Sequence, residues 1–162
     1  MTAWRDFERT EPDFAARVQS RFDAGRHKTM ATLRVDGSPR ISGIECEFVD
    51  GELRFGSMTG ARKLADIERD PRIALHGPTF HPETGREHEW IGEAKIAGRA
   101  VRVDADADSE PTGEGDASAE PDGVMFRVEI DGVAITRLDD TATKLLVESW
   151  TPRSGRRVVE RD

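Results

Sequence analysis

The sequence predicts a mainly β fold, a six- to seven-stranded antiparallel split β-barrel with an N-terminal helix and one short helix after the third strand. Two observations support this class. Runs of alternating apolar and polar residues recur from His27 to Trp150, and Asp-Gly pairs, which favour tight hairpin turns, separate several of these runs. Few segments have helical spacing, so the strands are expected to pair through hairpins and curl into a closed or split barrel.

The N-terminal helix is expected over residues 11–24. Three large apolar residues recur at a spacing of four, which places them on one helical face: Phe14, Val18 and Phe22. Thr10 lies just before Pro12, and its hydroxyl can accept a hydrogen bond from a backbone N–H that the first helical turn leaves unpaired. We therefore expect Thr10 at the N-cap.

Three strands are expected between His27 and Ser57, joined as an antiparallel meander. The pairs Asp36-Gly37 and Asp50-Gly51 supply the two turns. The middle strand, residues 40–49, has a face shared by Ile44, Cys46 and Phe48. This face is expected to point into the core, because side chains alternate along a strand.

The next segment is expected to contain the short helix, over residues 61–69. Pro71 is expected to end it, because the α region is disfavoured for the residue before a proline. A strand follows over residues 72–76, then a loop rich in proline, glycine and charge, and then a long strand over residues 90–103. Glycines within that long strand indicate bends or bulges of the kind that curl a sheet.

The C-terminal part is expected to add two strands joined by a turn at Asp131-Gly132, and a last strand over residues 145–150. Residues 104–123 carry eight acidic residues, no basic residue and no large apolar residue. Such a segment cannot bury enough surface to offset its ordering entropy, so we expect an acidic, flexible loop. Residues 1–162 otherwise form one expected domain.

Composition restricts the function. The net charge of −8 is unfavourable for binding nucleic acid, and no apolar stretch approaches the ~20 residues of a membrane span. The single cysteine, Cys46, excludes an intramolecular disulfide and fits a cytoplasmic protein. The four histidines lack the spacing of a metal site, so no metal is expected.

The strand-to-helix corner FGSMTGARK is the strongest candidate binding site. Free backbone N–H groups at a helix start favour an anion, and Arg62 with Lys63 would add two positive charges where the helix dipole disfavours cations. A phosphate group explains this pattern, with Ser57 and Thr59 completing the cradle. The alternative is that both cations pair with acids of the helix such as Asp66, at a small gain in stability.

The whole chain from His27, apart from the acidic segment, resembles the pyridoxamine 5′-phosphate oxidase-like family of flavin-binding split barrels. The resemblance is carried by ATLRVDGSP, by the corner with its Arg-Lys pair, by DPRIAL and by the ending WTPRSG. It implies a homodimer that holds FMN, or the deazaflavin coenzyme F-420, in the groove between subunits. It also implies an oxidoreductase that transfers hydride to or from a small organic substrate.

By position, the resemblance implies that Arg62 and Lys63 hold the cofactor phosphate, assisted by Ser57 and Thr59. The stretch from Arg40 through Ser42 and Gly43 would lie along the ring and ribityl chain. Trp150, or Trp90 of the other subunit, would flank the ring. No catalytic acid or base is identified.

Two departures from the family pattern limit this expectation. Where true pyridoxamine phosphate oxidases carry cations that help to bind the flavin, this sequence has Ser42 and Glu47, and the serine of their Ser-Arg-Lys is Ala61. Vitamin B6 oxidation is therefore not expected. A non-catalytic module that binds flavin or haem remains the alternative to an enzyme.

Overall fold

A computed structural model describes residues 1–103 and 123–161. Its helices are α1 (Trp4–Thr10), α2 (Pro12–Asp23) and α3 (Arg62–Arg69), with a short 3₁₀ turn η1 (Glu87–Glu89). Its strands are β1 (Lys28–Leu33), β2 (Pro39–Ile44), β3 (Cys46–Val49), β4 (Glu52–Met58), β5 (Arg72–His76), β6 (Glu93–Val103), β7 (Gly123–Leu138), β8 (Leu145–Thr151) and β9 (Gly155–Arg161). The mainly β class is confirmed, and the acidic segment expected over residues 104–123 lies, except for Gly123, outside the described residues.

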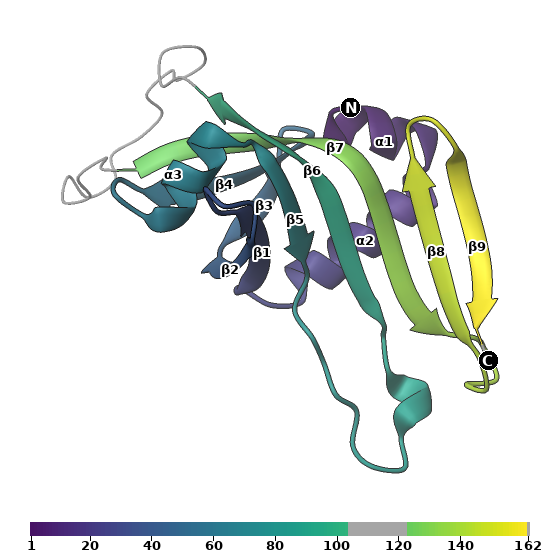
Figure 1. Ribbon diagram of the computed structural model, residues 1–162. Coiled ribbons are helices and arrows are strands. Elements are labelled where there is room, and N and C mark those ends of the chain that lie inside the picture. The colour runs from purple at the N-terminus through teal and green to yellow at the C-terminus, as the bar shows by residue number, and fades with distance from the viewer. Residues whose placement is uncertain (104–122, 162) are drawn as a thin grey trace, which may run out of the picture.

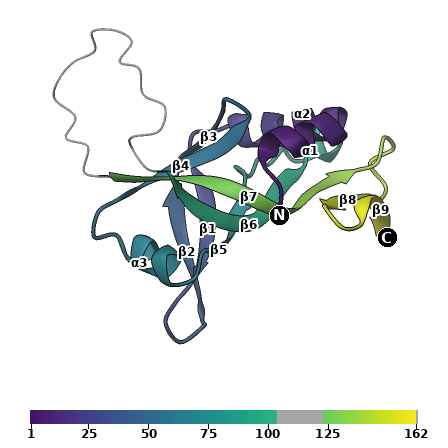
Figure 2. The same cartoon turned by 90° about the horizontal axis from the view of Figure 1, so that it is seen from above.

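The strands of the described part form one antiparallel sheet in the order β2-β1-β5-β6-β7-β4-β3, and β8 and β9 extend it beside β7. Its two end strands, β2 and β3, are consecutive in the chain and separated by Glu45 alone. The sheet therefore curls toward closure without closing, as in a split barrel (Figures 1 and 2).

The expected three-strand meander is wrong in its middle strand. The predicted strand is interrupted at Glu45. Its first part, β2, pairs with β1, and its second part, β3, pairs with β4. Ile44 and Cys46 nevertheless both face inward, so the predicted alternation holds across the break. The buried Lys28 stabilises the junction by donating from Nζ to the carbonyl oxygen of Cys46, 3.1 Å away, so that this backbone group is not left unpaired.

The prediction of a turn at Asp131-Gly132 is also wrong, because β7 runs unbroken through these two residues. Ala97 of β6 pairs with Gly132 and Gly98 pairs with Ile130, so Asp131 is the extra residue of a β-bulge. Gly98 permits this close approach, since a Cβ there would lie 2.1 Å from the carbonyl oxygen of Glu129. By contrast, Asp50-Gly51 makes the predicted tight turn, with positive φ at both residues.

The N-terminal segment contains one more helix than expected. α2 matches the predicted helix, and its apolar face is buried, but Glu11 occupies the N-cap. Thr10 ends α1 instead, and its hydroxyl donates to the carbonyl oxygen of Asp6. Both helices pack on the sheet at the end away from α3 (Figure 2).

An aromatic cluster joins the two N-terminal helices to the sheet. Its members pack with ring centroids 4.3–6.0 Å apart: Trp4, Phe7, Phe14, Phe22, Phe48 and Trp150. The sheet has nine strands in the described residues rather than six or seven. Residues 40–49 form two strands and β9 was not predicted, while the two strands expected on either side of Asp131-Gly132 are the single strand β7. Among the described residues, no helix is long and apolar enough to span a membrane.

Candidate functional site

A cavity of about 290 Å³ lies beside α3, where the β1–β2 hairpin approaches the helix. The helix contributes Arg62, Ala65, Asp66 and Arg69, and the hairpin contributes Arg34, Val35, Asp36 and Arg40. Four arginines against two aspartates give the lining an excess of two positive charges. This excess contrasts with the net charge of −8 for the whole chain.

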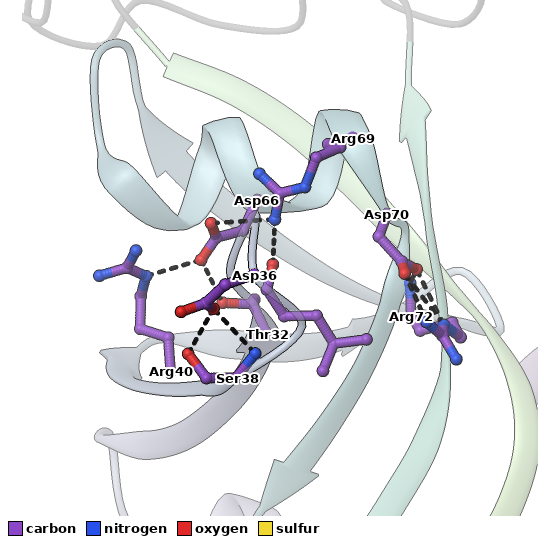
Figure 3. A network of polar contacts seen from close by, with 9 residues as sticks. Thr32, Asp36, Ser38, Arg40, Asp66, Arg69, Asp70 and Arg72 are labelled. Carbon is purple, nitrogen blue, oxygen red and sulfur yellow. Dashed lines mark hydrogen bonds and ion pairs between the residues drawn. The ribbon is translucent and has the colours of Figure 1, made fainter.

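Asp66 links α3 to the β1–β2 hairpin through hydrogen bonds along the cavity wall (Figure 3). Its carboxylate is buried and accepts hydrogen bonds from Thr32 Oγ1 at 2.9 Å, Arg40 Nε at 2.6 Å and an Arg69 Nη at 3.3 Å. The bond from Arg40 is the main reason that the pKa of Asp66 falls from 3.8 to about 2, despite burial. Arg69 also donates to the carbonyl oxygen of Leu33, which ties α3 to the end of β1.

Two cations of the lining form no ion pair with any described residue, although Arg34 adds to the effect of the Ser38 hydrogen bonds in lowering the pKa of Asp36. Within the described residues, Arg34 and Arg62 form no ion pair, whereas Arg40 and Arg69 are held by Asp66. The expected alternative, an ion pair between Arg62 and Asp66, is therefore absent from the described contacts. Arg62 is exposed at the start of α3, where the helix dipole adds positive potential.

Lys63 connects the same helix to β2. Its Nζ donates to the carbonyl oxygen of Gly43, 3.0 Å away. This acceptor is neutral, and among the described residues no carboxylate forms an ion pair with the ammonium group. Ser42 lies on the face of β2 that also carries Arg40. The structure thus brings together Arg40, Ser42, Gly43, Arg62 and Lys63, although two distant parts of the chain supply them.

Three predicted residues lie elsewhere. Ser57 points inward from β4, and its buried Oγ has no hydrogen-bond partner among the described residues. Thr59 is exposed in the turn between β4 and α3. Trp150 lies on β8, which Figure 1 shows at the end of the sheet away from α3; its side chain is 6% exposed and packs on Phe7, with ring centroids 4.7 Å apart.

Sequence reasoning missed Arg34 and Arg69 as lining residues, and Asp66 as the group that orients Arg40. Arg34 lies in the β1–β2 loop, two residues before Asp36, so the predicted hairpin turn was a signal that could have indicated it. The helical positions offered another signal, because Arg62, Asp66 and Arg69 recur at spacings of four and three on one face of α3.

The described residues contain no group of three or more histidine, cysteine, aspartate or glutamate side chains able to hold a metal ion. Cys46 does not offer an activated thiol either, because burial raises its pKa to about 11. The chemistry that the cavity favours is the binding of an anion with several oxygens, such as a phosphate group.

The model of the pyridoxamine 5′-phosphate oxidase family matches residues 16–137. A comparison with curated protein sequences found no match. The fold is similar to that of a pyridoxamine 5′-phosphate oxidase-related, FMN-binding protein from Nostoc punctiforme, with 14% identity, a TM-score of 0.61, and coverage of 94% of this chain and 96% of that one.

Two other solved structures extend this comparison. PhzG from Burkholderia lata, in complex with tetrahydrophenazine-1-carboxylic acid, has 12% identity and a TM-score of 0.59, and covers 96% of this chain and 89% of that one. The haem storage protein HutZ from Vibrio cholerae has 16% identity and a TM-score of 0.52, with coverage of 77% and 93%. At these identities the structures show a shared fold, and the family model spans most of the sequence, so the chain belongs to the pyridoxamine 5′-phosphate oxidase-like family.

Proposed function

We propose that the chain is a flavin-dependent oxidoreductase that holds the phosphate of FMN in the cavity between α3 and the β1–β2 hairpin. The excess of positive charge in this cavity is the observation that carries the proposal. The family to which the chain belongs, and the FMN-binding protein that shares its fold, point to a flavin as the phosphate-bearing ligand.

The residues present fit a phosphate monoester, which carries close to two negative charges at neutral pH. Arg62 and Arg34 line the cavity and form no ion pair with a described carboxylate, so their guanidinium groups can donate to a phosphate. Arg40 is anchored through Nε by Asp66, which fixes the guanidinium plane while its two Nη groups remain to bind oxygen. Lys63 would add a further charge from its position beside Gly43.

The bound flavin would supply hydride transfer, and the chain would supply binding, orientation and electrostatics. Ser42 and Gly43 lie next to the cavity on β2, so they are the backbone along which the rest of the cofactor would extend. Gly43 is suited to this, since a Cβ there would meet no atom within 4 Å and the strand surface is open.

We further propose a homodimer with the cofactor in the groove between subunits. β2 is an end strand of the sheet with an unpaired edge, and Ile41 on it is 75% exposed. Met58, at the end of β4, is also 75% exposed. Exposed apolar side chains beside an unpaired strand edge favour coverage by a second subunit.

FMN titration tests the proposal. The double variant Arg62→Ala with Lys63→Ala is expected to weaken FMN binding by roughly 10- to 1,000-fold, because it removes two charge-assisted contacts of about 1.5–3 kcal/mol each before partial compensation. Riboflavin, which lacks the phosphate, should bind the variant and the wild type equally. Arg9→Ala removes an exposed arginine on α1, 79% exposed, and should not change FMN binding.

Two results would reject this assignment: no binding of FMN at high micromolar concentration, or equal loss of FMN and riboflavin in the double variant. The second would mean that the cations stabilise the corner and do not contact the phosphate. Analytical ultracentrifugation tests the dimer separately.

The alternative ligand is the deazaflavin coenzyme F-420, and the alternative role is a non-catalytic module that binds flavin or haem. The observation that favours the module is that Ser42 and Glu47, the latter exposed and acidic, stand where the resemblance implies cations. Mass spectrometry of the ligand released from native protein separates the cofactors. Tight flavin binding without reduction by NAD(P)H or reduced deazaflavin would favour the module.

A further inference from the structure

A second cavity, of about 350 Å³, is lined in part by the long β5–β6 connection. Figure 1 shows this connection at the end of the sheet away from α3. The connection before η1 contributes Thr79, Phe80, His81 and Pro82 to the lining of the cavity. Glu87, Trp90, Glu93 of β6 and Leu138 of β7 complete it. A volume of this size lies in the range of roughly 300–1,000 Å³ that small-molecule sites occupy.

The cavity combines aromatic walls with negative charge. Phe80 and Trp90 line the cavity, and aromatic faces attract cations through their quadrupoles; no lysine or arginine lines the space. Two carboxylates, Glu87 and Glu93, are part of the lining. This composition is the reverse of the arginine-rich cavity beside α3.

The two carboxylates are not equivalent. Glu93 lies 2.6 Å from Lys95 Nζ and 3.4 Å from His76 Nε2, so its charge is compensated within the sheet. Glu87 accepts one hydrogen bond from the backbone N–H of Gly85 at 2.9 Å and forms no ion pair within the described residues. The uncompensated negative charge of the cavity is therefore that of Glu87.

We propose that this cavity binds a compact organic cation, an alkylated or aromatic ammonium compound, between the rings of Phe80 and Trp90 with its charge facing Glu87. Aromatic faces beside a carboxylate are a general solution for recognising ammonium groups, because they stabilise the charge without requiring full hydration. The site does not depend on flavin binding, since it shares no residue with the cavity beside α3.

Titration with phenyltrimethylammonium tests the proposal, by calorimetry and by tryptophan emission. Trp4 and Trp150 are buried, so Trp90 is the partly exposed tryptophan that would report occupancy. We expect saturable binding of this cation, and at least tenfold weaker binding of phenylacetate, which has a similar aromatic body and the opposite charge.

Glu87→Gln is the decisive variant, because its amide oxygen can still accept from Gly85 and the turn should be retained. It should weaken binding of phenyltrimethylammonium about tenfold. Glu89→Gln is the matched control in the same turn, since the Glu89 carboxylate accepts a hydrogen bond from Arg86 and does not line the cavity. Trp90→Ala should abolish the calorimetric signal.

The proposal is overturned if wild-type protein does not bind the cation at millimolar concentration, or if phenylacetate binds as tightly. It is also overturned if Glu87→Gln and Glu89→Gln weaken binding equally, because that result would reflect the general negative charge of the protein. Circular dichroism of each variant shows whether the fold is retained.

Discussion

Replacing Glu148 with glutamine removes the carboxylate that joins the C-terminal hairpin to α2. Glu148 lies on β8, is 1% exposed, and accepts two bonds of 2.7 Å from Arg17 of α2. It also accepts from Arg137 Nε of β7 at 2.8 Å and from an Arg156 Nη of β9 at 2.5 Å. One side chain therefore holds four elements together.

The expected loss can be worked out from this geometry. Breaking a buried, hydrogen-bonded charge pair costs about 3–5 kcal/mol when the partner charge is left buried. Here the three arginine side chains are 31–37% exposed and can recover some hydration. Glutamine also retains one acceptor oxygen, so we expect Glu148→Gln to lower the free energy of unfolding by about 2–4 kcal/mol. This corresponds to a fall of roughly 5–15 °C in Tm.

The effect should depend on pH. The three arginines, Arg17 first, hold the folded-state pKa of Glu148 well below its ordinary value of 4.5. The carboxylate therefore contributes its stabilisation above about pH 4.5, and this contribution is lost as the pH falls through the lower folded-state pKa. The difference in Tm between wild type and variant should be largest at neutral pH and shrink in acid.

Thermal unfolding followed by circular dichroism, from neutral pH to about pH 3, measures both effects. Glu160→Gln is the matched control, because Glu160 on β9 makes an ion pair with Lys144 at 61% exposure and should shift Tm by no more than about 2 °C. A variant that unfolds like wild type, or a deficit that does not change with pH, would refute the role assigned to the Glu148 carboxylate.

Three further predictions follow from local geometry. Asp66→Asn should lower Tm at neutral pH, and the difference should narrow between about pH 4 and pH 2, because the folded-state pKa of Asp66 is lowered to about 2; thermal unfolding across this range measures it. Gly98→Ala should destabilise the fold by about 1–3 kcal/mol in urea unfolding, since its Cβ would clash with Glu129, whereas Gly43→Ala has open space and should change stability by less than about 0.5 kcal/mol. The Cys46 thiol should react with a disulfide reagent much more slowly in native than in urea-unfolded protein, because burial raises its pKa to about 11; equal rates would contradict this.

Much of the fold could be predicted because the signals are local. Alternation placed Ile44 and Cys46 on the inward face, and the spacing of Phe14, Val18 and Phe22 identified α2. Asp50-Gly51 forms the expected turn because both residues tolerate positive φ. Asp131-Gly132 has the same local signal. There, however, β7 pairs with β6 along the whole length of β6, and Asp131 becomes the extra residue of a β-bulge.

The candidate site was predicted in part for a similar reason. The Arg62-Lys63 pair at a helix start indicated an anion site from local chemistry, and the structure places Arg40 and Gly43 beside it. Arg40 could be placed only through the resemblance to known proteins, because it lies 26 residues from Asp66, which orients it. The burial of Trp150 against Phe7 could not be predicted in the same way, since a sequence does not indicate which aromatic side chains meet in the core.

The sequence by itself determined the class of secondary structure, the inward faces of most strands and the position of the cationic corner, because these depend on residues within a few positions of one another. The tertiary structure decided the break at Glu45, the unbroken β7 and the choice of which arginines stay uncompensated. These features depend on pairings between distant segments, as when Arg17 reaches Glu148 over 131 positions. Burial sets their strength, because removal from water strengthens each polar contact and makes an unmatched one costly.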